Sequence, residues 1–178
     1  TGAIAGTTGK FNITAGTGTS SITTGAGDDT FTFAAGTGLT SADTVDGGTG
    51  MDTIALTGNT VFTASNDFDN VKNIEVITLG NTSTAVAITT VDALVASGAT
   101  LTLTNAANSG ALTFIGSAET NGVFNITGGT GNDSITGGAG NDTIAGGAGN
   151  DSITAGLGSD TITGDADDDT FTFAAGTG

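Results

Sequence analysis

The sequence predicts an all-β protein in which short parallel strands coil into a flattened solenoid. A nine-residue phrase of the form G-G-x-G-x-D-x-U-x, where U is a large apolar residue, starts at residue 128 and continues to residue 172. The chain also contains 32 glycines, too many for stable helices. Apolar residues make up 36% of the chain and are spread along its whole length, which argues against a disordered polypeptide.

Each nonapeptide supplies one strand and one turn. The "DSIT"-type quartets can extend, while the "GGxGN"-type stretches form the turns, since glycine allows positive φ angles and close backbone approach. Two nonapeptides complete one coil, so residues 18 apart lie on the same side. The U side chains are expected to stack inside the solenoid: Ile135, Ile144, Ile153, Ile162 and Phe171.

One aspartate stands at position 6 of each repeat: Asp133, Asp142, Asp151, Asp160 and Asp169. Carboxylates stacked about 4.8 Å apart repel each other unless a cation lies between them. Carboxylate and turn carbonyl oxygens together form a shell that suits a hard divalent ion, above all Ca²⁺. The spacing predicts three sites: between Asp133 and Asp151, between Asp142 and Asp160, and between Asp151 and Asp169.

A second, more broken set of repeats precedes residue 56. "TGAGDDTFT" (24–32) contains Asp29, "GLTSADTVD" (38–46) keeps Asp43, and "GGTGMDTIA" (47–55) is complete with Asp52. Ser20 replaces the aspartate in "AGTGTSSIT" (15–23), which should weaken any site that it faces. The break after Phe33 leaves the stacking partners of these three aspartates open.

Residues 56 to 123 lack the nonapeptide. Runs rich in Thr, Val, Ile and Leu predict strands within 71–79, 84–90, 99–104 and 111–116, and "VDALVASG" (91–98) is the one helical candidate. We therefore divide the chain into a partial repeat block (1–55), an irregular β-solenoid segment (56–127) and a second repeat block (128–178). "GDDTFTFAAGTG" (27–38) recurs almost unchanged at 167–178, so we expect a piece of a longer repetitive protein.

Composition excludes several functions. The net charge is −16 with only two basic residues, Lys10 and Lys72, so binding to nucleic acid or to an anionic membrane surface is not expected. No run of 18 apolar residues predicts a membrane span. Without His or Cys, the chain lacks the groups for Ser–His–Asp or Cys–His catalysis, and we expect no enzyme activity.

Several acidic residues lie outside the regular register. Glu75 and Glu119 are expected to face solvent or cap turns rather than act as ligands. Asp165, Asp167 and Asp168 are either auxiliary ligands or plain surface charge, and the sequence leaves both open.

The phrases "GGTGNDSIT", "GGAGNDTIA" and "GGAGNDSIT" resemble the RTX (repeats-in-toxin) nonapeptide. The resemblance implies a parallel β-roll/β-helix solenoid with Ca²⁺ in its turns. It also implies that the repeat aspartates bind the ion together with carbonyls of the Gly-rich turns. The turn glycines in question are Gly129, Gly131, Gly138, Gly140, Gly147 and Gly149.

The whole chain is similar to Ca²⁺-dependent bacterial S-layer proteins of the Caulobacter type and to giant RTX adhesins. This implies a secreted, extracellular protein of the bacterial cell surface that leaves the cell by type I secretion. Its partners would be lattice or filament neighbours of its own kind, and cell-surface polysaccharide bound through other regions. The alternatives are a spacer or ligand-binding segment of an adhesin, or the calcium-dependent C-terminal region of a secreted enzyme.

Overall fold

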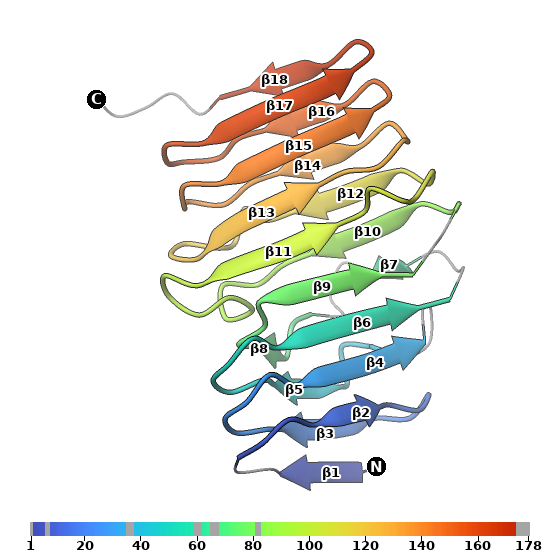
Figure 1. The fold of residues 1–178 in the computed structure, drawn as a ribbon, viewed down its shortest axis with the longest axis vertical. Coiled ribbons are helices and arrows are strands. Elements are labelled where there is room, and N and C mark those ends of the chain that lie inside the picture. Colours follow the sequence, from blue (N-terminus) through green and yellow to red (C-terminus); the bar gives the residue numbers. More distant parts are fainter. Residues whose placement is uncertain are drawn as a thin grey trace.

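The computed structural model describes residues 2–5, 8–34, 38–58, 62–64, 68–80 and 83–173. In these ranges the chain forms strands and turns only, and it coils into a two-layered solenoid with β1 and β18 at opposite ends (Figure 1). None of the described residues belongs to a helix long and apolar enough to cross a membrane. The all-β solenoid predicted from the repeats is confirmed.

Eighteen strands follow one another along the chain. They are β1 (Gly2–Ala5), β2 (Asn12–Thr14), β3 (Ser20–Thr23), β4 (Thr30–Ala34), β5 (Thr44–Asp46), β6 (Thr53–Thr57), β7 (Phe62–Ala64), β8 (Val71–Lys72), β9 (Val76–Leu79), β10 (Val86–Thr89), β11 (Thr100–Thr104), β12 (Leu112–Ile115), β13 (Val123–Thr127), β14 (Ser134–Thr136), β15 (Thr143–Ala148), β16 (Ser152–Thr154), β17 (Thr161–Ala166) and β18 (Thr170–Thr172).

The strands form three parallel sheets. One layer is an eight-stranded sheet of order β17-β15-β13-β11-β9-β6-β4-β2. The other layer contains a six-stranded sheet, β18-β16-β14-β12-β10-β7, and a four-stranded sheet, β1-β3-β5-β8 (Figure 1). The eight-stranded sheet runs through all three segments proposed from the sequence, whose boundaries stay a prediction.

The pairing register fixes the length of each coil. In the C-terminal block Ile135 pairs with Ile153, and Ile153 pairs with Phe171, so each coil advances by 18 in the numbering, as predicted. Coils in the middle of the chain are longer, whereas the first ones, with Asn12 paired to Thr30, also advance by 18. Phe31 pairs with Ile54, which pairs with Ile77, and each of these coils advances by 23. The extra residues enlarge the turns and leave the parallel register of the sheet intact.

The core lies between the two layers and consists of the inward-facing side chain of each strand. Ile135, Ile144 and Ile153 are buried, as expected for the U position. Ile162 is partly buried, while Phe171 is 42% exposed because β18 is the edge strand of its sheet. The strand alternation thus follows the period-2 pattern of the repeat, with Thr and Ser facing outward.

The central segment follows the strand predictions but not the helix prediction. The predicted run 71–79 is interrupted at residues 73–75, where Asn73 adopts a positive φ of 56°. Residues 91–98 form separate tight turns instead of a helix. The amide of Leu94 donates to the carbonyl of Val91 within one turn, while the carbonyl of Leu94 accepts from the amide of Ile74 in a neighbouring coil. Its apolar Leu94 and Val95 are buried in the core.

Candidate metal centre

The repeat aspartates form two columns, one beside each layer of the solenoid. Asp133, Asp151 and Asp169 lie at the start of β14, β16 and β18, and Asp142 and Asp160 at the start of β15 and β17. The amide of Asp133 donates to Oδ1 of Asp151 (2.8 Å), and the amide of Asp151 donates to Oδ1 of Asp169 (2.9 Å). The amide of Asp142 donates to Oδ1 of Asp160 in the same way (2.9 Å). Each carboxylate is therefore anchored to the main chain of the coil before it.

The second carboxylate oxygen faces the glycine-rich turn of its own repeat. Oδ2 of Asp133 accepts from the amide of Gly129 (2.7 Å), and Oδ2 of Asp142 accepts from the amide of Gly138 (2.8 Å). Oδ2 of Asp151 is buried and makes no hydrogen bond. A buried anionic oxygen without a partner is costly, so this atom is available to a cation.

Position 1 is glycine in four of the five C-terminal repeats, the exception being Ala155, and a carboxylate and a carbonyl oxygen converge on three of these glycines. A Cβ on Gly128 would collide with Oδ2 of Asp133 and with the carbonyl oxygen of Gly146 from the next coil. The same pair recurs as Asp142 Oδ2 with the Ala155 carbonyl at Gly137, and as Asp151 Oδ2 with the Gly164 carbonyl at Gly146. The missing side chain keeps a space that is lined by carboxylate and carbonyl oxygen.

The carbonyls expected to be ligands lie in the stacked turns, at positions 2 and 4. The carbonyl of Gly129 accepts from the amide of Ala148 (3.0 Å), and that of Gly138 from the amide of Leu157 (2.9 Å). Those of Gly131 and Gly140 contact later glycines, and Gly147 and Gly149 have positive φ angles of 114° and 106°. The sequence analysis did not predict the position-1 carbonyls, because a main-chain oxygen has no residue type that would identify it in a sequence. Ligation by any of these oxygens stays a prediction.

The N-terminal block contains a third column, which the sequence did not reveal in full. The amide of Asp29 donates to Oδ1 of Asp52 (2.8 Å), and the amide of Asp52 donates to Oε2 of Glu75 (2.8 Å). Oδ2 of both aspartates is buried without a hydrogen bond. Glu75 therefore continues the acidic column instead of facing solvent or capping a turn. The signal was a constant spacing of 23 in the numbering, which the shorter period of two nonapeptides conceals.

Asp43 resembles Asp133 and Asp142 in that protein donors reach both of its oxygens, but its turn donor is a threonine instead of a glycine. Its Oδ1 accepts from the amide of Ser20 (2.7 Å), and its Oδ2 accepts from both the amide and the hydroxyl of Thr40 (2.8 Å each). Protein donors thus occupy both oxygens. The serine that replaces an aspartate at position 20 contributes its main chain to this contact, which any residue could supply.

Apolar residues interrupt the acidic columns in the central coils. By register, Leu101 and Phe124 occupy the column positions between Glu75 and Asp142. On the other layer Leu112 precedes Asp133, and its amide donates to Oδ1 of that aspartate (2.7 Å). The central coils fill with hydrocarbon the positions that the repeat blocks fill with carboxylates.

The columns concentrate negative charge without nearby protein cations. Burial raises the pKa values of Asp133, Asp142 and Asp151. Burial, reinforced by the charges of Glu75, Asp29 and Asp28, raises the pKa of Asp52 to about 6. Among the described residues the ion pair is Lys72 with Asp46 (3.0 Å), at the surface and away from these columns.

This donor set fits a calcium-type ion. The described ranges hold no cluster of three or more acidic side chains able to bind a metal on their own. The oxygen shell must therefore combine a carboxylate with main-chain carbonyls, which is what the space at Gly128, Gly137 and Gly146 offers. Oxygen-only shells of this kind suit Ca²⁺, whereas Zn²⁺ prefers nitrogen and sulfur ligands.

Comparison with known proteins agrees with this geometry. Four copies of the model for the RTX calcium-binding nonapeptide repeat match residues 12–39, 37–58, 125–153 and 146–178, more than half of the chain. The chain belongs to the RTX calcium-binding nonapeptide repeat family. No curated protein and no solved structure matches the chain. The RTX repeats bind calcium, and the matched ranges contain every acidic column position except Glu75.

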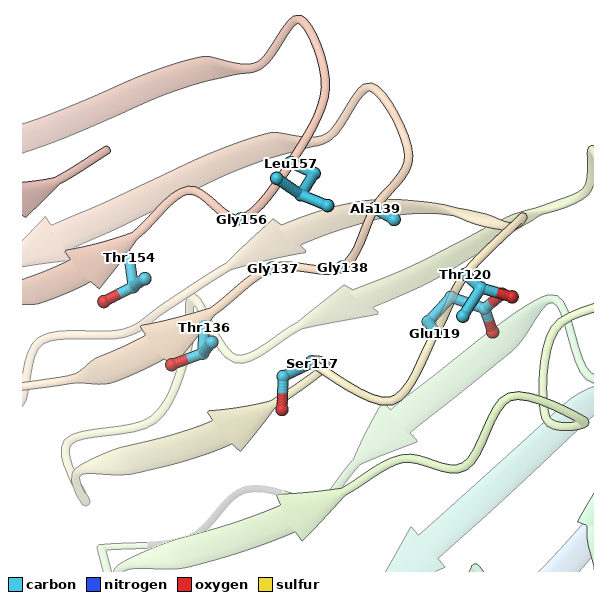
Figure 2. A pocket seen from close by; sticks show the side chains of 10 residues that line it. All are labelled: Ser117, Glu119, Thr120, Thr136, Gly137, Gly138, Ala139, Thr154, Gly156 and Leu157. Atoms are coloured by element: carbon cyan, nitrogen blue, oxygen red, sulfur yellow. The ribbon is translucent and has the colours of Figure 1, made fainter. Parts of the chain in front are cut away.

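The RTX turns also border a shallow hollow of about 320 Å³ on one edge of the solenoid. Figure 2 shows Glu119 and Thr120 together at one end of it, away from Ser117, Thr136 and Thr154. Backbone of the stacked glycine turns forms much of its wall. Glu119 is the one ionisable residue in its lining.

Proposed function

We propose that this RTX chain is a structural segment of a calcium-dependent, self-assembling extracellular surface layer or matrix. The observation that carries the proposal is the outer face of the eight-stranded sheet. Its strands present two ladders of short, uncharged side chains. By register one ladder consists of Asn12, Thr30, Thr53, Val76, Thr102, Asn125, Thr143 and Thr161, and the other of Thr14, Thr32, Ala55, Thr78, Thr104, Thr127, Ala145 and Thr163.

A flat uncharged face favours lateral contact between solenoids. The chain carries 18 acidic residues, yet none stands on these two ladders. Sheets of this kind pack face to face at about 10 Å when their side chains are short enough to interdigitate. Calcium in the turns neutralises the remaining charge, so repulsion between neighbouring copies would fall as the ion binds.

Calcium dependence favours an extracellular location. The buried carboxylates have no ion pair with a lysine among the described residues, so bound calcium adds directly to the stability of the folded repeats. Such a chain would be less stable at the low calcium concentration of a cytosol and gain its full stability after export. RTX repeat proteins are typically secreted, and we extend this to the bacterial cell surface, with cell-surface polysaccharide as a partner of regions outside these residues.

We also propose that the segment is not an enzyme. The sequence has neither His nor Cys, and its buried carboxylates are engaged with main-chain amides of adjacent coils. The hollow of Figure 2 has one ionisable residue in its lining, Glu119, so it does not offer a pair of carboxylates for acid–base chemistry.

The test is particle size during a calcium titration, followed by light scattering and negative-stain microscopy. Growth into sheets, tubes or fibres that dissolve again on chelation supports a layer or matrix protein. A chain that only compacts and remains monomeric points to an adhesin spacer or to the calcium-dependent region of a secreted enzyme.

Two lysine variants link assembly to the ladder face. Thr104→Lys and Thr143→Lys place a charge on the exposed ladder surface. Ser97→Lys, at an exposed turn position, is the matched control. We expect the first two variants to fold with calcium but assemble poorly, and the control to assemble normally. Equal assembly by all three would remove the ladder face from the proposal.

A further inference from the structure

Residues 119–127, "ETNGVFNIT", occupy the place of a nonapeptide without its usual residues. Asn125 pairs with Thr143 and Ile126 with Ile144, so this segment is in register with the repeat 137–145. Phe124 then stands at position 6, where the aspartate belongs, and Glu119 at position 1, where glycine belongs. This segment therefore has one acidic residue, as a regular repeat does, but at position 1, before the turn, instead of at position 6, after it.

The Glu119 carboxylate is buried inside this turn. Only 1% of the residue is exposed. Oε1 accepts from the amides of Asn121 (3.0 Å) and Gly122 (2.8 Å), much as Asp142 accepts from the amide of Gly138 in the next coil. Oε2 is buried with no hydrogen-bond partner. A buried carboxylate oxygen without a hydrogen-bond donor is costly, so Oε2 is available to a cation.

The turn of Asp142 lies directly on Glu119. The carbonyl of Glu119 accepts from the amide of Ala139 (3.0 Å), and a Cβ on Gly138 would touch the Glu119 side chain. The Glu119 charge also contributes to the raised pKa of Asp142, so the two carboxylates sense each other. The two lysines of the chain stand at positions 10 and 72, and the second is paired with Asp46.

We propose that Glu119 is a cation ligand that closes the acidic column at the junction between the central segment and the C-terminal repeats. Its carboxylate, with oxygens of the turn that contains Asp142, binds a hard divalent ion of the Ca²⁺ type. This site does not follow from the nonapeptide pattern, because the acid enters from position 1. It is independent of whether the solenoids assemble into a layer.

The decisive variant is Glu119→Gln in the complete chain. Glutamine keeps an oxygen that can accept from the Gly122 amide but removes the charge. We expect one fewer Ca²⁺ per chain in equilibrium dialysis and a smaller rise in Tm on adding calcium, while calcium-free stability is unchanged or higher. Asp92→Asn is the control, since Asp92 is exposed and bonds the neighbouring Thr120. It should leave the calcium number unchanged.

A second variant moves the acid back to the usual position. Glu119→Gly combined with Phe124→Asp recreates a regular repeat and should bind as many ions as the parent chain. A parental ion number in Glu119→Gln would overturn the proposal, and Glu119 would then only cap its turn. If Glu119→Gln does not fold, the double variant decides. A parental number means that the regular site replaces the one lost with Glu119, whereas one ion more than the parent chain means that Glu119 held none and contradicts the proposal.

Discussion

At the scale of the residue, the position-6 aspartate has two separate tasks. Asp151 shows both: Oδ1 accepts from the main-chain amide of Asp133 one coil earlier, and Oδ2 is buried and unbonded. The first contact satisfies a donor that the sheet ladder would otherwise leave unpaired. The second oxygen is the one a cation can use. Coil stacking and ion binding thus depend on one side chain.

The two tasks can be separated by substitution at Asp151. Asn can still accept from the Asp133 amide but loses the charge, whereas Ala loses both contacts. Asp151→Asn should weaken calcium binding with little effect on the calcium-free chain. Asp151→Ala should also leave a buried amide unsatisfied, at a cost of about 1–3 kcal/mol. Calorimetric calcium titrations and urea unfolding of both variants measure the difference.

The position in the column provides the control for this prediction. Asp151 has an acidic neighbour in the coil on each side, Asp133 and Asp169. Asp133 has the apolar Leu112 on one side, and Asp169 belongs to the exposed edge strand region. Asp151→Ala should therefore damage calcium binding more than Asp133→Ala or Asp169→Ala. Equal losses in all three would contradict coupling along this stack.

The raised pKa of Asp52 predicts how the stability of the calcium-free protein depends on pH. Its pKa is about 6 in the folded chain against 3.8 for an unperturbed carboxyl, mainly because it is buried. Between these two values the folded state binds more protons than the unfolded state, so stability falls as the pH rises from 4 to 6 and stays low above that. The loss should be about 2 kcal/mol.

Urea unfolding of calcium-free protein at pH 4.5, 5.5 and 7 tests this dependence. Asp52→Asn, which keeps the acceptor for the Asp29 amide but does not titrate, should flatten the profile. Calcium should flatten it as well, because the ion favours the carboxylate. A calcium-free chain that becomes more stable as the pH rises would show that burial is not the dominant influence on these groups.

Residue-level prediction from the sequence was good where the period was regular. The stacking of Asp133 on Asp151 followed from two nonapeptides per coil, and the register confirms it. Glu75 was missed because the coils there are longer than two nonapeptides. Glu119 caps its turn, one of the two roles expected for it, through the amides of Asn121 and Gly122. Its burial was not predicted, because that depends on the turn that packs over it, which a single sequence does not encode locally.

At the scale of the element, the repeats that begin with Gly128, Gly137 and Gly146 depend on the absence of a side chain at position 1. Gly146 stands where Oδ2 of Asp151 and the carbonyl of Gly164 converge. Its backbone does not need a positive φ, so the requirement is space rather than conformation. A methyl group would occupy the volume that an ion or its ligands need.

Gly146→Ala should therefore destabilise the chain and weaken calcium binding together. We expect a loss of about 2 kcal/mol or more, since the colliding atoms belong partly to backbone that cannot move away. Gly16→Ala is the matched control, because a Cβ there meets nothing within 4 Å and no positive φ is involved. Thermal unfolding with and without calcium should separate the two variants clearly.

Elements were predictable where a local signal decided them. Strands such as β11 (Thr100–Thr104) and β12 (Leu112–Ile115) match runs of Thr, Leu and Ile, because outward Thr and inward aliphatic side chains suit a half-buried sheet. The prediction of a helix at 91–98 was wrong because contacts with other coils decide the conformation there. The Leu94 carbonyl and Gly98 amide pair with other coils, and those contacts replace helical hydrogen bonds.

At the scale of the whole molecule, the solenoid contains two kinds of coil. The repeat blocks place buried carboxylates in their columns, while the central coils place Leu101, Leu112 and Phe124 there. Phe124 also packs edge-to-face on Phe114, with ring centroids 5.1 Å apart. The central coils are held by apolar packing and need no cation for it.

Removing calcium should therefore loosen the chain unevenly. In hydrogen–deuterium exchange, chelation should raise exchange in β14 to β17 and in β4 to β6 by an order of magnitude or more. Strands β10 to β12 should change much less. Uniform loss of protection along the chain would show that the solenoid unfolds as one cooperative unit.

Leu101 and Phe124, at the column positions between Glu75 and Asp142, also separate the charges of the two repeat blocks. Three strand spacings lie between Glu75 and Asp142 along the eight-stranded sheet, about 14 Å at 4.8 Å per strand. With an effective dielectric constant of about 20, two unit charges at that distance interact by about 1 kcal/mol, against about 3.5 kcal/mol at one strand spacing. Calcium binding in one block therefore has little effect on the calcium affinity of the other. The two blocks can then bind calcium over different concentration ranges. As the concentration rises, one end of the solenoid would become rigid before the other.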